Sequence, residues 1–447
     1  MTQEQYCQQC HLTYPHVDAS GPQVAAELTQ NLIRIPSLTP IQPDISAPAS
    51  CTLNYLEGYL TRFGANCTRL VFEGGHPKWG YPVDNLYAEW TFGQSQKHLC
   101  FLGHTDVVAP GDKDLWSENP YSAVLKDGWI YGRGATDMKG AVATFCAAVT
   151  QDIEALKNRA CKLSLLITTD EEWAAVNGTR KVLEWLHNEN KQIDAFIVGE
   201  PSSHDDLGSH IKIGRRGSLC GTLEALGIQG HAAYHDLFDN PNRALSLASA
   251  ILNAHIWDHD NPHFPATQFE IIACTAGDFG TTAIVPGKAK ALWNIRFTPE
   301  YSVSELIKTL KACLENPPHW AQSHPDFNKL KNITIHANTD TAALPYYSPP
   351  SHLAEIALQV TEKVTHQMPR LDGSGGTTDG RFVQNFFPNA QIIELGLPEK
   401  GGKINGALPF DYGNRGGMHQ IDERCSVSDI EILYKCYQGI IEKYFDE

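Results

Sequence analysis

Apolar residues recur at helical spacing in several stretches of the chain. In the first stretch, residues 24–35, the periodicity stops directly before Pro36, where a helix is expected to end. Short apolar runs bounded by turn residues separate these stretches and are typical of buried strands. The pattern predicts helices over residues 24–35, 51–63, 140–156, 178–186, 243–252, 302–314, 354–365 and 427–444. It predicts strands over residues 85–90, 99–102, 163–168, 195–198, 218–226, 268–274 and 288–297.

The order of these elements predicts two domains. Up to Gly217 strands and helices alternate, which favours an α/β fold with a mostly parallel sheet covered by helices. Beyond Gly217 the pattern resembles a smaller antiparallel α+β domain inserted into the first. We therefore predict an N-terminal extension over residues 1–22, a larger domain over 23–216 and 346–447, and an inserted domain over 217–345.

Size, composition and charge exclude several classes of protein. At 447 residues, with 42% hydrophobic and 19% charged residues, the chain is typical of a globular protein with more than one core. The net charge of −16 argues against a nucleic acid partner, which needs basic patches. No run of about 18 apolar residues suggests a membrane span. The polar start, Met1 to Tyr14, does not resemble a secretion signal, so a cytoplasmic location is expected.

The 12 cysteines are expected to be mostly free thiols. Most stand singly in apolar stretches, as Cys100 and Cys274 do, and buried free thiols suit a reducing cytoplasm. The exception is the pair Cys7 and Cys10 in CQQCH, whose spacing resembles a haem attachment site or half of a zinc site. Haem attachment would require export, and no second cysteine pair completes a zinc site, so we assign this segment no function.

Histidines and acids stand at the ends of several apolar runs, where open α/β sheets place their binding sites. Taken singly, each has an ordinary explanation as a polar strand end, a helix cap or a solvated loop residue. Taken together, their types match a site for two divalent metal ions that share one carboxylate. The predicted ligands are His104, Asp137, Glu172, Glu200 and His419. Zinc, cobalt and manganese all accept such ligands, so the sequence does not choose among them.

Glu171 is the predicted general base. It lies in Asp170-Glu171-Glu172, a run of three acids directly after an apolar strand. Adjacent like charges at a buried strand end are costly unless a cation neutralises them. A metal ion lowers the pKa of water to about 7, so a neighbouring carboxylate suffices as a base. We predict that Glu172 binds metal and that Glu171 accepts the proton.

Two further features concern how the ligands are presented. His104 and Asp106 are two residues apart on a predicted strand, so their side chains point the same way. Asp106 is therefore expected to hydrogen-bond the ring nitrogen of His104 that faces away from the metal. Asp137 follows a glycine-rich turn at residues 132–134 and has two oxygens with which to bridge two ions. The alternative is that Asp137 only caps the helix that follows.

Longer motifs resemble a known family. The stretches GHTDVVAPGD, GWIYGRGATDMKG, TTDEE, VGEPSS, GRRGS, QGHAAY and GGTTDGRF are similar to motifs of the succinyl-diaminopimelate desuccinylases, within the di-zinc aminoacylase and carboxypeptidase superfamily. The resemblance covers roughly residues 24–447. It implies an amide hydrolase that converts N-succinyl-L,L-2,6-diaminopimelate to succinate and L,L-2,6-diaminopimelate in lysine biosynthesis. It also implies a homodimer formed through the inserted domain.

The resemblance assigns roles by position. One zinc ion would be bound by His104 and Glu200, the other by Glu172 and His419, and both by Asp137. His231 of one subunit would reach the active site of its partner and stabilise the oxyanion. The positions that resemble substrate-binding residues are Arg215, Arg216, Arg296 and Thr377. Independently of the resemblance, paired arginines are a natural clamp for a polycarboxylate.

Some features depart from the family. Ala283 stands where the family usually has an asparagine that contacts substrate, and Thr378 replaces a serine. Residues 401–417 form a longer link to the last histidine ligand, and the first 22 residues have no counterpart. Two alternatives therefore stay open. One is an enzyme that acts on another N-acyl amino acid or peptide, such as an acetylornithine deacetylase or a carboxypeptidase. The other is a non-catalytic metal-binding relative.

Overall fold

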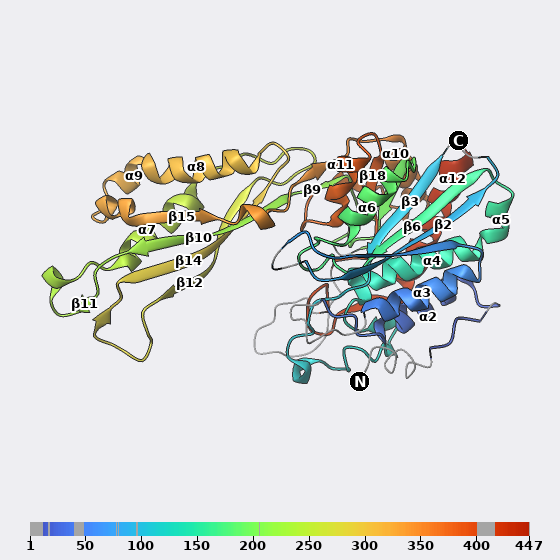
Figure 1. Cartoon of the computed structure of the whole chain (residues 1–447), viewed down its shortest axis with the longest axis horizontal. Coiled ribbons are helices and arrows are strands. Elements are labelled where there is room, and N and C mark those ends of the chain that lie inside the picture. The colour runs from blue at the N-terminus through green and yellow to red at the C-terminus, as the bar shows by residue number, and fades with distance from the viewer. Residues whose placement is uncertain are drawn as a thin grey trace. The chain divides into compact units, whose positions relative to one another are not determined.

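A computed structural model describes residues 12–16, 18–39, 49–76, 78, 80–94, 97–204, 206–399 and 416–446. The predictions for Cys7 and Cys10, and for most of the long link at 401–417, lie outside these residues. The described residues form two compact units (Figure 1). The second unit consists of Arg215–Tyr347 and Gly373–Thr377, and the first of all other described residues. The second unit begins two residues before and ends two residues after the range 217–345 expected from the sequence.

The first unit is built around an eight-stranded mixed sheet of order β1-β2-β6-β3-β7-β18-β8-β17 (Figure 1). The strands are β1 (Asn66–Phe72), β2 (Val83–Phe92), β3 (His98–His104), β6 (Cys161–Thr168), β7 (Ala195–Val198), β8 (His210–Lys212), β17 (Arg370–Asp372) and β18 (Gln391–Glu394). The run β6-β3-β7-β18 is parallel, as is the pair β8–β17. The pairs β1–β2, β2–β6 and β8–β18 are antiparallel. The predicted α/β class is confirmed, with antiparallel pairs toward both sides of the sheet.

Three neighbouring parallel strands position the polar residues of interest. Strands β3 and β7 are buried at every position, and β6 is buried at all positions but one. Strands covered on both faces read as continuous apolar runs, which explains why the sequence predicts them. His104 pairs with Thr168, and Leu102 pairs with Val198. The carboxyl ends of β3, β6 and β7 therefore meet at one edge of the sheet.

The helices of the first unit are α2 (Gly21–Ile33), α3 (Ala49–Thr61), α4 (Gly140–Gln151), α5 (Ile153–Lys157), α6 (Thr179–Asn188), α10 (His352–Thr365), α11 (Val383–Phe386) and α12 (Val427–Asp446). Helix α4 packs against α2 and α12, and α12 also contacts α10. Small residues dominate α4 and eleven of its twelve positions are buried, as in a helix surrounded by protein. No helix in the described part of the chain is long and apolar enough to cross a membrane.

The prediction of one helix over residues 140–156 was wrong in detail. The chain leaves the helical conformation at Asp152, whose φ is −101°, and α5 follows as a separate short helix. At this point the Asp152 carboxylate accepts a hydrogen bond of 2.8 Å from Gln438 on α12. This contact with another helix lies beyond the reach of a local periodicity argument.

The second unit contains an antiparallel sheet of order β12-β14-β10-β15. Its strands are β10 (Gly217–Leu226), β12 (Gln268–Ala276), β14 (Lys288–Phe297) and β15 (Ile333–Ala337). Helices α7 (Pro241–Ala254) and α8 (Val303–Glu315) pack with it, and the short pair β11 (Gly230–His231) and β13 (Ile284–Val285) extends from it. The unit also includes helix α9 (His319–Gln322). Strand β14 alternates between buried and exposed residues, which is typical of a sheet with one solvated face. The predicted antiparallel α+β character is confirmed.

The cysteines follow the prediction in part. Nine of the described cysteines are free, and most of these, including Cys100, are buried. Cys274 is exposed instead, because it lies on β12, the edge strand of a sheet with one open face. Cys51 departs from the expectation of free thiols because it is disulfide-bonded.

We expect the core of the second unit to depend on Trp293. This side chain is completely buried, and its ring centroid lies 5.9 Å from that of Phe269. Replacing Trp293 by alanine leaves a large cavity and should lower the free energy of unfolding by about 3–5 kcal/mol. Urea denaturation followed by circular dichroism measures the change. Trp320→Ala in the same unit is the control, since Trp320 is 49% exposed. Equal losses for both variants would contradict this account of the core.

Candidate metal centre

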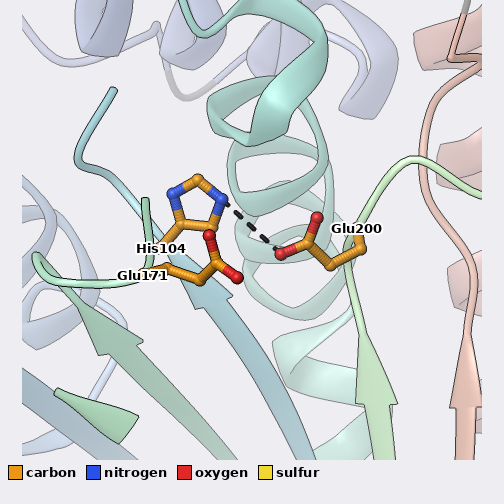
Figure 2. Close-up of side chains that lie close together, drawn as sticks. All are labelled: His104, Glu171 and Glu200. Carbon is orange, nitrogen blue, oxygen red and sulfur yellow. Dashed lines mark ion pairs between the residues drawn. The ribbon is translucent and has the colours of Figure 1, made fainter. Parts of the chain in front are cut away.

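Three of the predicted residues meet where the parallel strands end. His104 is the last residue of β3, Glu171 follows the end of β6, and Glu200 follows the end of β7. Figure 2 shows the His104 ring and the two carboxylates converging on one space at this edge. Ligand atoms of these three residues all lie within 4.8 Å of one another. The parallel pairing of the strands therefore brings the segments that carry these three residues to one edge of the sheet.

Loops bring the remaining residues to the same edge. Asp137 lies in a single irregular turn, Ala135–Lys139, directly after Gly134. Gly134 has a φ of 84°, a left-handed conformation that glycine adopts without strain, so the turn predicted from the glycines is present. His419 lies in the loop before β19 (Arg424–Ser426) and itself has a φ of 62°. Positive φ is uncommon for a residue other than glycine, so this loop is held in a demanding conformation.

Asp137 lies between the two histidines. Its Oδ1 is 3.2 Å from Nε2 of His104, and its Oδ2 is 3.3 Å from Nε2 of His419. Each histidine also faces a glutamate: His104 Nε2 is 3.6 Å from Glu200 Oε1, and His419 Nε2 is 3.0 Å from Glu172 Oε1. The residues thus divide into two groups that share one carboxylate. A bridging carboxylate between two metal positions requires this arrangement.

The cluster has an excess of negative charge. Burial and the charge of Asp137 raise the pKa of Glu172 to about 7. Burial and the charge of Glu200 raise the pKa of Glu171 well above its usual range. Hydrogen bonds to Asp137 and Glu172 raise the pKa of His419 to about 11. In the absence of a cation, these carboxyl groups and the His419 ring therefore hold protons more tightly, and a bound metal ion would neutralise the carboxylates instead. Two histidines and several carboxylates are ligands that zinc, cobalt and manganese all accept. This set of ligands indicates a metal site.

Asp106 contacts both sides of the cluster. It is completely buried, and its backbone oxygen lies 3.0 Å from Nδ1 of His104, whereas its Oδ1 is 3.5 Å away. Its carboxylate accepts hydrogen bonds from the backbone amides of Glu171, at 3.2 Å, and Glu172, at 3.0 Å. The shorter contact to the histidine ring thus comes from the main chain. The side chain holds the acidic loop, a contact that strand periodicity could not reveal.

Asp170 has a structural role that we did not predict. It is completely buried, and its carboxylate accepts hydrogen bonds from the Tyr81 hydroxyl at 2.7 Å and the Val176 amide at 3.1 Å. These bonds hold the loop that carries Glu171 and Glu172. The signal in the sequence was the run of three acids itself, because three adjacent carboxylates are unlikely to share one role.

The predicted substrate-binding arginines belong to the second unit. Arg216 Nη1 donates to the backbone oxygen of Ala266 at 2.9 Å, and Arg296 Nη1 lies 3.4 Å from the Thr377 hydroxyl. Burial, followed by the positive charge of Arg296, lowers the pKa of Arg216. Among the described residues, no carboxylate lies within ion-pair distance of Arg216 or Arg296, although the charges of Asp258 and Asp260 act on Arg216 from farther away. Two neighbouring guanidinium groups that no carboxylate contacts directly can receive an anion.

Two other residues with predicted roles in the site, Arg215 and His231, also belong to the second unit. Arg215 is 3% exposed, and its Nη1 donates to the backbone oxygen of Ser374 at 3.3 Å. His231 lies on β11 with an exposed side chain, and its Nδ1 accepts a hydrogen bond of 3.1 Å from the Ala233 amide. The metal cluster belongs to the first unit and these residues to the second.

Solved structures with the same fold include a metallo-carboxypeptidase and a dipeptidase. An M20 family metallo-carboxypeptidase from Sulfolobus solfataricus matches with a TM-score of 0.71 and 19% identity, covering 95% of this chain and 99% of the other. Human carnosine dipeptidase 1 matches with a TM-score of 0.71 and 16% identity, covering 98% of this chain and 99% of the other. Identities this low show a shared fold.

Sequence comparison identifies nearer relatives. A protein of Parvibaculum lavamentivorans named succinyl-diaminopimelate desuccinylase is 36% identical over 97% of this chain and 99% of its own length. Another of that name, from Rhodospirillum centenum, is 38% identical over 94% of this chain and 96% of its own length. The family model described as peptidase family M20/M25/M40 matches residues 100–443. With the chain covered almost completely by these relatives and for most of its length by the family model, this protein belongs to peptidase family M20/M25/M40, together with the succinyl-diaminopimelate desuccinylases.

Proposed function

We propose that this protein is a di-zinc amide hydrolase that cleaves N-succinyl-L,L-2,6-diaminopimelate to succinate and L,L-2,6-diaminopimelate, a cytoplasmic step of lysine biosynthesis. The observation that carries the proposal is the carboxylate of Asp137, which directs one oxygen toward each of two histidines. The names of the two relatives from Parvibaculum lavamentivorans and Rhodospirillum centenum support the substrate.

In this proposal the two groups of residues each hold one ion. His104 and Glu200 bind the first, Glu172 and His419 bind the second, and Asp137 binds both. The nitrogen and oxygen donors favour zinc, and cobalt or manganese can replace it. When bound, such ions polarise the carbonyl of the amide and lower the pKa of water to about 7.

Glu171 acts as the general base and then as the general acid. It removes a proton from the attacking water as the new C–O bond forms, and it gives that proton to the leaving amine as the C–N bond breaks. Its position within 4.8 Å of ligand atoms on His104 and Glu200 suits this role. The same position would allow Glu171 to bind metal instead, and a variant can distinguish the two roles. Asp106 acts through Glu171 and His104 by fixing their backbone and ring.

The second unit supplies recognition of the substrate. The succinyl group ends in a carboxylate, and an anionic substrate needs a local positive site in a protein with a net charge of −16. Arg216 and Arg296 have no carboxylate within ion-pair distance among the described residues, although Asp258 and Asp260 act on Arg216 from farther away, and the two arginines suit this task. Arg215 precedes Arg216 in the chain, and the Thr377 hydroxyl lies 3.4 Å from Arg296 Nη1. These two residues complete the proposed site.

The proposal includes a homodimer in which His231 reaches the partner's active site and stabilises the oxyanion. Exposed large apolar side chains gather in the segments around β11 and β13, which lie at one end of the second unit (Figure 1). They are Leu226, Ile228, Tyr234, Leu237, Phe279 and Ile284. A concentration of exposed apolar residues supports a protein partner at this end of the unit.

The first test is hydrolysis of N-succinyl-L,L-diaminopimelate in the presence of zinc. We expect release of succinate, and we expect its loss when a chelator removes the metal, because Asp137, His104 and His419 then have no ion to present to the amide. The comparison substrate is N-acetylornithine. Preferential cleavage of the acetyl compound would assign the protein to the related deacylases, and cleavage of neither by the zinc-bound protein would contradict the proposal.

Glu171→Gln tests the base. The amide cannot accept the proton, so kcat should fall by about 10²–10⁴-fold or more while the protein keeps its zinc. Turnover assays and metal analysis measure the two properties. Glu89→Gln is the control, since Glu89 on β2 is hydrogen-bonded to Lys191 and is not part of the cluster. If zinc is lost with activity, Glu171 is a ligand, and if turnover is unchanged it has neither role.

Arg216→Ala tests recognition of the acyl carboxylate. Loss of a charge-assisted hydrogen bond should raise KM for the succinyl substrate by about 10–100-fold. Any residual cleavage of an acetyl substrate, which lacks that carboxylate, should change little. Arg243→Ala provides the control, because Arg243 is an arginine of the same unit whose side chain is 52% exposed. An equal effect on both substrates would place Arg216 outside the acyl site.

A further inference from the structure

A buried ion pair connects the two loops that carry Asp137 and His419. Arg133 follows β5 (Trp129–Tyr131), and Glu423 precedes β19, with which β5 pairs. Arg133 Nη1 lies 2.5 Å from Glu423 Oε2, and the two side chains are 2% and 0% exposed. Arg133 lies in the glycine-rich motif GWIYGRGATDMKG, but the sequence suggested no role for it or for Glu423.

The remaining hydrogen bonds of this pair reach the metal-binding loops. Glu423 Oε1 accepts from the backbone amides of Thr136, at 3.1 Å, and Asp137, at 3.2 Å. Arg133 Nη2 donates to the backbone oxygens of Ala109 and His419, each at 3.3 Å. This one ion pair thus holds the main chain of Asp137 through Glu423 and the main chain of His419 through Arg133.

His419 depends on such support more than the other histidine does. The His104 side chain is 1% exposed, within a strand, whereas that of His419 is 47% exposed, within a loop. The backbone of His419 has a φ of 62°, and such conformations persist only where surrounding contacts enforce them. Packing therefore fixes the ring of His104, while main-chain anchors must fix that of His419.

We propose that Arg133 and Glu423 are positioning residues that set the distance between Asp137 and His419 for the second metal ion. The inference rests on the two-metal site of the proposed function and is independent of the substrate. A buried ion pair adds little stability on average, because removing two charges from water offsets most of their attraction. Both partners of this pair contact loops that carry proposed metal ligands, so the pair can position those ligands even if it adds little stability.

Three variants separate positioning from stability. Glu423→Gln leaves the Arg133 charge buried and turns an amide donor toward it, and Arg133→Met leaves the Glu423 charge unpaired. Both single variants should unfold at lower temperature than the wild-type protein. The double variant Arg133→Met with Glu423→Gln contains neither charge, and its glutamine can still accept from the Asp137 amide. It should recover most of the thermal stability without restoring the anchor on His419.

The measurement is titration of the metal-free proteins with zinc by calorimetry, and with cobalt by its visible absorption. Wild type and the control Glu89→Gln should bind two ions. In the double variant one ion should bind about 10–100-fold more weakly, the usual effect of removing a partner behind a metal ligand. A change in the cobalt spectrum would report altered geometry directly. Arg133→Lys, which keeps the charge but not the planar group, should rescue the affinity only in part.

Wild-type affinity for both ions in the stable double variant would overturn the inference, as would a wild-type protein that binds fewer than two ions. Equal weakening of both ions would also overturn it. The double variant loses the bond to His419, which serves the second ion only, whereas its glutamine can keep the bond to Asp137, which serves both. No substrate enters these titrations. Failure of the wild-type protein to cleave the succinyl compound would therefore refute the proposed substrate, whereas the titrations alone decide the role of Arg133 and Glu423.

Discussion

The crowding of carboxylates around two histidines is the constraint on which the rest of the site depends. Asp137, Glu171, Glu172 and Glu200 are brought together at one edge of the sheet, where they are largely removed from water. Ionised carboxylates in such surroundings repel one another and lack solvation, so a cation is the natural partner. The pKa values of Glu171 and Glu172 are raised because burial and the neighbouring negative charges disfavour their ionised forms.

Holding like charges together requires a rigid frame. Three parallel strands supply the coarse positions, because their carboxyl ends coincide at His104, Thr168 and Val198. Buried polar residues supply the finer ones, as Asp106 does through the amides of Glu171 and Glu172. Each of these bonds involves a charged acceptor and a main-chain donor, a combination stronger than bonds between neutral groups. The ligands are thus fixed mainly through their backbones, which leaves their side chains to face a metal.

The two units have complementary chemistry. The first gathers negative charge that suits metal ions, and the second presents Arg216 and Arg296, whose mutual repulsion suits an anion. In a protein with a net charge of −16, two neighbouring arginines form a local positive site that differs from the overall field.

Much of the fold could be predicted from the sequence, for local reasons. Strands such as β3 and β6 are continuous apolar runs because both faces are covered, and β14 alternates because one face is open. The short strand β18 was missed although it lies in the middle of the sheet, between β7 and β8. Shortness alone does not explain this, because β7 has four residues too and was predicted. The place of β18 in the sheet comes from pairing with distant segments.

The sequence by itself determined which residue types stand at strand ends and turns, and hence the candidate ligands His104, Asp137, Glu172, Glu200 and His419. Only the tertiary structure decided how they pair, because the distances between their side chains depend on strands and loops far apart in the chain. It also decided that Asp106 holds the acidic loop and that Arg133 and Glu423 join two other loops. The physical reason is that hydrogen bonds between residues hundreds of positions apart leave no periodicity in a sequence, whereas burial of a strand or helix face does.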